Sequence, residues 1–312
     1  MSRAILLLNM GGPSSLDEVE LFLRNMFADK YILQTNPFIR KIVGNIIVKK
    51  RLEEAQENYR AIGSKSPLLA ITNSLTQKVT QQLHTPCYPI MRYVPPFAKE
   101  QLLKLKSQGV EELILFSMYP HFSTTTTQSS LDDIIDTLNE IEYAPKLHII
   151  KSYYKDSDYI KIQAKLIQEA LGDTNPNDIK LIISAHGLPL SIIQKGDPYQ
   201  RHIEVNSALL EAKLKDMGID FKEVELAYQS KVGGGAWLEP NLSDVLRKPS
   251  HLKVLIFPIA FTIDNSETIF ELDIEHREIA QKMGYEYYKV VPCPNDREDF
   301  AHFIAKRVEN IL

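Results

Sequence analysis

Cysteine is scarce in this chain of 312 residues, which contains Cys87 and Cys293 and no others. Two cysteines are too few for a disulfide scaffold, a zinc ribbon or a four-cysteine iron–sulfur cluster. A chain that does without disulfides is typical of a reducing compartment, so we expect a cytoplasmic protein.

An excess of positive charge is also missing. The sequence has 36 Lys and Arg residues against 40 Asp and Glu residues, a formal net charge of −4. Because nucleic-acid-binding domains carry a basic surface, this balance argues against a nucleic-acid partner. The nucleotide-binding motifs GxGxxG and GxxxxGK followed by Ser or Thr are absent, as is the GxSxG motif of serine hydrolases.

Long apolar runs are missing as well. The longest uncharged apolar run, residues 254–261, is far shorter than the roughly 20 residues that a membrane-spanning helix needs. The apolar run near the start ends at Asn9, before it reaches the length of a signal-peptide core. We therefore expect neither a signal peptide nor a spanning helix, and peripheral contact with the inner face of a membrane stays open.

Short apolar runs without alternation predict buried strands at residues 4–8, 112–116, 180–184 and 253–258. Strands of this kind are covered by helices on both faces. Helical patterns lie between or after them, at residues 16–27, 98–108, 130–141, 159–171, 201–217 and 266–282. This alternation predicts an α/β fold with parallel sheets.

The two halves of the sequence resemble each other weakly, because each has a strand that runs into a small-residue turn (LLLNMGGP and LIISAHGLP). This pattern predicts two doubly wound units, at residues 1–145 and 146–295. A last helix, within residues 296–312, can pack back on the first unit. Ligand sites of parallel sheets lie outside the carboxyl ends of the strands, and the candidate residues below cluster there.

His186 follows the predicted strand at residues 180–184, and Gly187 and Pro189 favour a tight turn after it. A histidine there is a candidate general base or metal ligand. It can equally be a histidine that is hydrogen-bonded at a strand end, with Gly187 serving only the turn.

Glu267, Glu271 and Glu275 recur every four residues after the strand at 253–258, with Asp264 before them. On a helix they form one acidic row, which like-charge repulsion makes unfavourable. A solvated helix face explains such a row as well as a function does. As a functional feature, the row can replace the water ligands of a divalent cation and pass the cation inward. The imidazole of His186 and the carboxylate of Glu267 are ligands that suit Fe(II).

Two further segments are candidates for ligand or surface contacts. Trp237 follows Gly233, Gly234 and Gly235, so we expect a large ring on a flexible turn, suited to a flat apolar ligand. Residues 36–51 combine Ile, Val and Phe with Arg and Lys. They predict either an ordinary amphipathic helix over the sheet or a cationic surface for a membrane or an anionic ligand.

Seven segments together resemble the ferrochelatases, which insert ferrous iron into a porphyrin at the end of haem synthesis. They are LLLNMGGP at 6–13, YRAIGSKSPL at 59–68, MRYVPP at 91–96, YPHFSTTTTQSSL at 119–131, LIISAHGLPLSIIQKGDPY at 181–199, YQSKVGGGAWLEP at 228–240 and FTIDNSETIFELDIE at 261–275. The resemblance covers nearly the whole chain and implies two Rossmann-like lobes of the class II chelatase type, with a porphyrin cleft between them.

The resemblance also implies roles for individual residues. His186 and Glu267 become the catalytic pair, and the metal-handling residues become His186, Glu267, Glu271 and Glu275, with Asp264 added as the head of the acidic row. The porphyrin contacts it implies are Met10, Arg92, Tyr119 and Ser123, to which we add the aromatic candidates Tyr93 and Trp237. The substrates it implies are Fe(II) and protoporphyrin, with no tightly bound cofactor. Alternatives are coproporphyrin, another metal chelatase of this fold, or a porphyrin or haem carrier without turnover.

Two departures from the family pattern bear on these expectations. Many relatives have a histidine where this chain has Asn265, so His186 is left as the expected single imidazole. Animal members hold an iron–sulfur cluster in a C-terminal extension, and this chain has too few cysteines for one. We expect no cluster.

Overall fold

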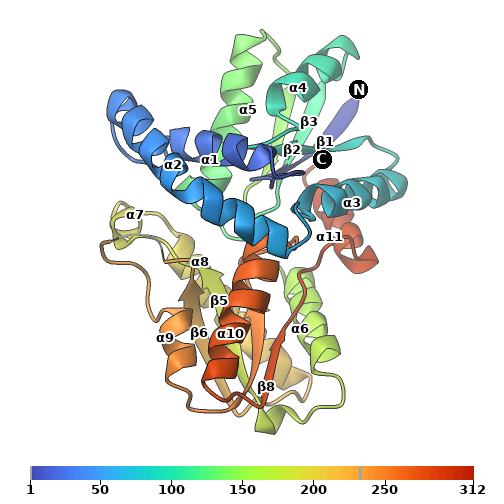
Figure 1. The fold of residues 1–312 in the computed structure, drawn as a ribbon. Helices are drawn as coiled ribbons and strands as arrows, with labels where there is room; N and C mark the ends of the chain where they lie inside the picture. Colours follow the sequence, from blue (N-terminus) through green and yellow to red (C-terminus); the bar gives the residue numbers. More distant parts are fainter. Residues whose placement is uncertain (1, 232–233) are drawn as a thin grey trace. The chain divides into compact units, whose positions relative to one another are not determined.

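The structure is a computed structural model that describes residues 2–231 and 234–312. The chain divides into two compact units, the first made of residues 1–152 and 296–312 and the second of residues 153–295 (Figure 1). The boundary placed after residue 145 differs from this division, because Lys146–Ile150 forms an edge strand of the first sheet.

The first unit has a four-stranded parallel sheet of order β2-β1-β3-β4. Its strands are β1 (Arg3–Asn9), β2 (Cys87–Met91), β3 (Glu112–Ser117) and β4 (Lys146–Ile150). Its helices are α1 (Glu18–Ala28), α2 (Pro37–Ala61), α3 (Leu68–Leu83), α4 (Ala98–Ser107), the π-helix η1 (Thr124–Gln128), α5 (Ser129–Glu140) and α11 (Glu298–Glu309).

The second unit has a four-stranded parallel sheet of order β6-β5-β7-β8. Its strands are β5 (Lys180–His186), β6 (Glu223–Gln229), β7 (Lys253–Pro258) and β8 (Tyr287–Val290). Its helices are α6 (Ser157–Leu171), the 3₁₀ turn η2 (Pro176–Asp178), α7 (Leu190–Gln194), α8 (Tyr199–Asp216), α9 (Leu242–Arg247), the π-helix η3 (Glu267–Glu275) and α10 (His276–Lys282).

The predicted α/β fold with parallel sheets is confirmed, and the four predicted strands are β1, β3, β5 and β7. One face of the first sheet buries Ala4, Leu6 and Leu8 against α4 and α5, in one cluster with Leu102 and Ile134. Residues at alternate positions share a face of a strand, which explains why a run that is apolar throughout needs cover on both sides. The porphyrin cleft expected between the lobes stays a prediction.

The second sheet is built in the same way and positions the segments that carry the candidate residues. Ile182 of β5 and Ile256 of β7 share a buried cluster with Leu246 of α9 and Leu272 of η3. Leu272 is fully buried, so its anchoring places η3 over the sheet. The acidic side chains of η3 are thereby held near the carboxyl ends of β5 and β6.

The basic and apolar segment at residues 36–51 comprises the N-cap and the first part of α2. The Asn36 side chain accepts a hydrogen bond from the backbone N–H of Ile39, and Pro37 occupies the first helical position, which together define a helix start. Within the described ranges, no helix combines the length and the apolar character that crossing a bilayer requires.

Candidate active site

His186 is the last residue of β5, at the carboxyl edge of the second sheet. Its Nδ1 lies 2.6 Å from Oε2 of Glu267, and its side chain is 36% exposed. Because a carboxylate oxygen accepts, Nδ1 carries the hydrogen, and in the neutral ring the lone pair lies on Nε2. The Tyr199 hydroxyl donates to the His186 carbonyl over 2.9 Å and fixes the strand end.

The turn after His186 requires a residue without a side chain. The backbone N–H of Gly187 donates to the Gln229 carbonyl over 2.8 Å. A Cβ atom on Gly187 would lie 2.8 Å from that same oxygen, closer than real Cβ contacts allow. Gly187 is therefore needed for the close approach of two chain segments.

A serine joins the acidic side chains of η3. The Ser230 hydroxyl donates to Oε2 of Glu271 over 2.5 Å and lies 3.3 Å from Oε2 of Glu267. Ser230 has φ +65°, a left-handed conformation that costs a non-glycine residue about 1–2 kcal/mol. Gln229 donates to Glu271 as well, over 3.3 Å, and accepts from the Ser184 hydroxyl over 2.7 Å.

The electrostatics of this network separate its two carboxylates. Burial opposes charge on His186, but Glu267 and Glu271 outweigh it and raise the pKa of the imidazole. Burial works against the charge of Glu267 too, yet His186 and the Ser230 hydroxyl lower the pKa of that carboxyl overall. Burial and the charge of Glu267 raise the pKa of Glu271 to about 7. One carboxylate is thus charged beside the imidazole, and the next one can gain or lose a proton near neutral pH.

The other two acidic candidates, Glu275 and Asp264, lie after and before the two carboxylates of this network. Glu275, at the end of η3, is exposed. Asp264 accepts hydrogen bonds from Thr268 Oγ1 over 2.9 Å and from Asn295 Nδ2 over 2.6 Å. Both of its carboxylate oxygens therefore stabilise the turn before η3. These bonds do not connect Asp264 to Glu267, Glu271 or Glu275.

Asn265, which the resemblance sets apart from the family pattern, has a structural role. Its Oδ1 accepts from the backbone N–H of Glu267 over 2.8 Å, and its Nδ2 donates to the Ile263 carbonyl over 3.0 Å. With 7% exposure, this side chain fixes the start of the helix that carries Glu267.

Trp237 differs from its expectation. It was predicted on a flexible turn, but it pairs with Pro189, and the next residue, Leu238, donates its backbone N–H to the Leu188 carbonyl over 3.0 Å. The segment after His186 therefore holds the backbone at Trp237, and the residue is partly buried. Gly233, part of the glycine run used in that prediction, lies outside the described residues.

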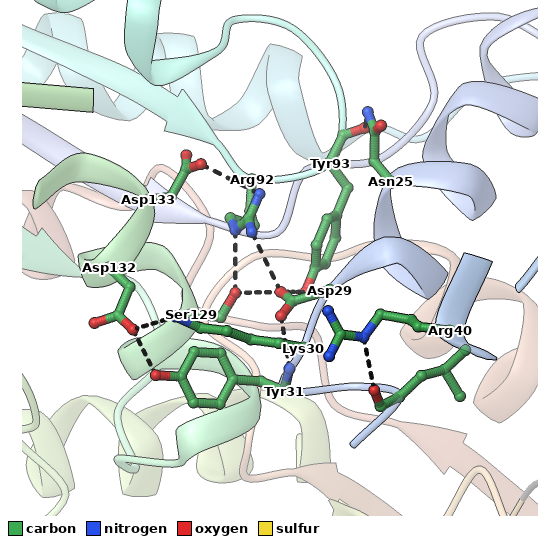
Figure 2. Close-up of polar contacts among 11 residues, drawn as sticks. Asn25, Asp29, Lys30, Tyr31, Arg40, Arg92, Tyr93, Ser129, Asp132 and Asp133 are labelled. Atoms are coloured by element: carbon green, nitrogen blue, oxygen red, sulfur yellow. Dashed lines mark hydrogen bonds and ion pairs between the residues drawn. The ribbon is translucent and has the colours of Figure 1, made fainter. Parts of the chain in front are cut away.

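Arg92 lies in the first unit, directly after β2, within a cluster of opposite charges (Figure 2). Its Nε donates to Ser129 Oγ over 3.0 Å, and its terminal nitrogens lie 3.5 Å from Asp29 and 3.3 Å from Asp133. A cavity of about 340 Å³ borders this cluster. Arg92 is 24% exposed, and its charge is already balanced by two carboxylates.

The remaining porphyrin candidates of the first unit are unequal in exposure. Met10 and Tyr119 are partly exposed. Tyr93 is 3% exposed and its hydroxyl donates to Asp29 over 2.9 Å. Ser123 is fully buried and caps the start of η1 by accepting from the Thr125 N–H over 3.2 Å. In this structure, Tyr93 and Ser123 support the sheet edge and do not present a side chain to a ligand.

Residue-by-residue reasoning missed the partners that organise these clusters. They are Ser230, Gln229, Ser184 and Tyr199 in the second unit and Asp29 and Ser129 in the first. Ser230 and Gln229 belong to the YQSKVGGG segment. This segment resembles the ferrochelatases, but the resemblance alone assigns no role to either side chain. Among the residues that the structure describes, no group of three or more His, Cys, Asp or Glu side chains forms a metal cage.

Comparisons with known proteins show the family of this chain and agree with its fold. The ferrochelatase family profile matches residues 2–312. A ferrochelatase of Wolinella succinogenes is 46% identical, over 99% of this chain and 98% of the relative. One of Campylobacter concisus is 45% identical, with the same coverage.

Solved structures share the fold at low sequence identity. SirB from Bacillus subtilis with Fe³⁺ has a TM-score of 0.58 and 12% identity, over 100% of this chain and 96% of that one. CbiX, described as the terminal enzyme for siroheme biosynthesis in denitrifying bacteria, has a TM-score of 0.54 and 13% identity, over all of both chains. Together with the family match, these comparisons confirm the resemblance: the chain belongs to the ferrochelatase family and is an enzyme that inserts a metal ion into a porphyrin.

Proposed function

We propose that the enzyme inserts Fe(II) into protoporphyrin IX, with His186 as the base that removes the two inner pyrrole protons in turn. The observation that carries this assignment is the 2.6 Å hydrogen bond from His186 Nδ1 to Glu267. This bond leaves the Nε2 lone pair free in the neutral ring, which is the form that a general base requires. The reaction gives protohaem and releases two protons.

Glu267 then acts on His186. Its negative charge stabilises the imidazolium that forms when Nε2 takes a proton, in the way a carboxylate orients and supports a catalytic histidine. A carboxylate engaged in this bond has less capacity to hold a metal ion. We therefore assign Glu267 chiefly to orientation and charge balance, and we assign metal exchange to the outer members of the row.

Glu271 and Glu275 form the proposed route for iron and protons. Glu271, with its pKa raised to about 7 by burial and by Glu267, can release a proton as a cation arrives and regain one as the cation leaves. Glu275 is the exposed end of the row, where hydrated Fe(II) first exchanges water for carboxylate oxygen. Asp264 is left out of this route because Thr268 and Asn295 occupy its oxygens.

The porphyrin itself has to leave planarity before iron can enter, because its four nitrogen atoms lie in the plane of the ring. An enzyme accelerates this step by binding the bent ring more tightly than the flat one. Met10, Tyr119 and Trp237 are partly exposed, and we propose them as contacts of the ring. Arg92 stays a proposed contact for a propionate only if its pairs with Asp29 and Asp133 open.

Peripheral membrane contact through residues 36–51 is a further part of the proposal. Phe38, Ile42 and Ile46 of α2 are 75%, 46% and 51% exposed, and the segment carries five basic residues and no acidic one. Such a helix face suits an anionic bilayer, where an apolar substrate dissolves. Sedimentation with phosphatidylglycerol vesicles tests it, and replacing Ile42 and Ile46 by Glu should abolish binding.

Anaerobic assays with Fe(II) and either protoporphyrin or coproporphyrin test the substrate. We expect turnover of protoporphyrin with a kcat/KM at least about tenfold above that of coproporphyrin, which is a difference of about 1.4 kcal/mol. A preference for coproporphyrin would overturn the substrate assignment. Tight porphyrin binding without product formation would point to a carrier, and insertion of Co(II) or Ni(II) in preference to Fe(II) to another chelatase.

A further inference from the structure

His276 lies at the junction of η3 and α10, five residues beyond Glu271. It is 3% exposed, and its Nδ1 lies 2.6 Å from the Glu271 carbonyl oxygen. Because a carbonyl only accepts, Nδ1 carries the hydrogen. The backbone N–H of His276 donates to the same oxygen, so one residue supplies both donors to the carbonyl of Glu271.

The other ring nitrogen is held by the neighbouring helix. Nε2 of His276 lies 3.2 Å from the Ser243 hydroxyl of α9, and with the hydrogen on Nδ1 it accepts from that hydroxyl. Burial lowers the pKa of His276, in keeping with a neutral ring that makes both bonds. Ser243 is fixed in turn, because its backbone N–H donates to the Asn241 side chain over 3.0 Å.

These bonds bear on the shape of η3. A π-helix bonds each carbonyl to the N–H five residues ahead, is rare, and needs support from its surroundings. At Glu271 the N–H five residues ahead is that of His276, and the ring bond to the same carbonyl favours this register over the ordinary α-helical one. The register matters because it decides whether Glu267 and Glu271 both reach Ser230, as they do here.

We propose that His276 is a positioning residue that, with Ser243, locks the register of η3 and so holds the Glu271 carboxylate in place for the incoming metal ion. Glu271 is then fixed at two ends: Ser230 and Gln229 hold the carboxylate, and His276 holds the backbone carbonyl. This inference rests on the proposed role of Glu271 in metal exchange.

Variants that keep or remove the Nδ1 donor test the proposal. His276→Phe keeps a ring and removes both bonds, whereas His276→Asn keeps an N–H donor near the place of Nδ1. We expect His276→Phe to raise KM for Fe(II) about tenfold, as loss of support behind a metal-handling residue commonly does, with KM for protoporphyrin unchanged. His276→Asn should stay within about threefold of the parent enzyme, consistent with rescue by the conservative change.

Binding of Co(II) in the absence of porphyrin gives a second measurement that does not depend on turnover. Its dissociation constant, followed by visible absorption, should rise in His276→Phe and, by a smaller factor, in Ser243→Ala, which is too small a change to unfold the protein. His251→Phe is the matched control, since His251 bonds Glu223 at 3.0 Å away from η3.

The outcomes separate the inference from the proposed function. Equal effects of His276→Phe and His276→Asn, or a parallel rise in KM for the porphyrin, would show a merely structural role and overturn the inference. If Glu271→Gln raises KM for Fe(II) while His276→Phe and Ser243→Ala do not, only the inference fails. If Glu271→Gln has no effect on metal KM or Co(II) binding, the proposed function of the acidic row fails first.

Discussion

The two units of the chain share one plan. Their sheets have corresponding strand orders, β2-β1-β3-β4 and β6-β5-β7-β8, all parallel. In each, a π-helical segment lies between the third strand of the unit in sequence and the helix that follows it: η1 between β3 and α5, and η3 between β7 and α10. Within this plan Asn9 and His186 are equivalent, because each ends the central strand β1 or β5.

The carboxylates at these equivalent edges have different partners. In the first unit Arg92 directly follows β2 and lies between Asp29 and Asp133 (Figure 2). In the second unit Ser230 directly follows β6 and bridges Glu267 and Glu271, which have an imidazole but no Lys or Arg among the bonds that the described residues make with them. At the first edge an arginine therefore lies between the carboxylates, as suits a supporting role. At the second edge the partner is an imidazole, and the pKa values of the adjacent Glu267 and Glu271 are pushed apart, as in reactive sites.

Removing the side chain at the two equivalent strand ends should have the largest effect on activity, and a very unequal one. His186→Ala removes the proposed base, and we expect kcat for Fe(II) insertion to fall by about 10²- to 10⁴-fold. Asn9→Ala loses only the 2.8 Å bond from the Met10 N–H and should cost less than about tenfold. Stopped anaerobic assays followed by the Soret band measure both. Comparable losses in the two variants would place the chemistry at both edges.

The pH dependence of activity should respond to the carboxylate at the second edge and not to the one at the first. Glu267 raises the pKa of His186, and the base acts in its neutral form, so activity is lost as the pH falls through that raised pKa. In Glu267→Gln the pKa of His186 falls, and the acidic limb of the kcat/KM profile should move to lower pH. The maximum rate should drop by about 10- to 100-fold.

Asp133→Asn serves as the matched change in the first unit, since Asp133 faces Arg92 and no histidine. Its profile should keep the acidic limb of the parent enzyme. A limb that stays in place in Glu267→Gln would mean that another group is the base.

The sequence located the centre of each sheet and missed its edges. The strands that it predicted, β1, β3, β5 and β7, are the inner strands of their sheets, where cover on both faces demands unbroken apolar runs. The missed strands β2, β4, β6 and β8 are edge strands. Glu223–Gln229 mixes acidic and apolar residues and Cys87–Met91 contains Pro89, so neither presents the pattern of a buried strand.

A similar limit applied to the site. His186 and Glu267 were predicted because each follows an inner strand at the edge where ligands bind. Ser230 and Asp29 were not, because their importance comes from partners that are far away in sequence: Ser230 bonds Glu271, and Asp29 bonds Tyr93. Such partners are set by the tertiary fold, and single positions carry no signal of them.

Stability should respond with opposite signs in the two units. The Asp29 side chain is 1% exposed and accepts hydrogen bonds from Tyr93, Ser129 and the Tyr31 N–H. Asp29→Ala leaves these three donors without this acceptor and removes one of the two carboxylates that face Arg92. We therefore expect the free energy of unfolding to fall by about 1–3 kcal/mol.

In the second unit, removal of a carboxylate should stabilise the protein. Glu271 has a pKa of about 7 in the folded state, above its ordinary value of 4.5, so above pH 4.5 the unfolded chain carries this charge more readily than the native one. The resulting cost grows as the pH rises to 7 and is then constant. Glu271→Gln removes it and should add up to about 2 kcal/mol at pH 8, with no gain at pH 4. Hydrogen exchange during urea titration reports each unit separately. If Glu271→Gln instead lowers the free energy of unfolding at pH 8, the charged carboxylate stabilises the fold. The two edges would then not differ in the sign of this effect.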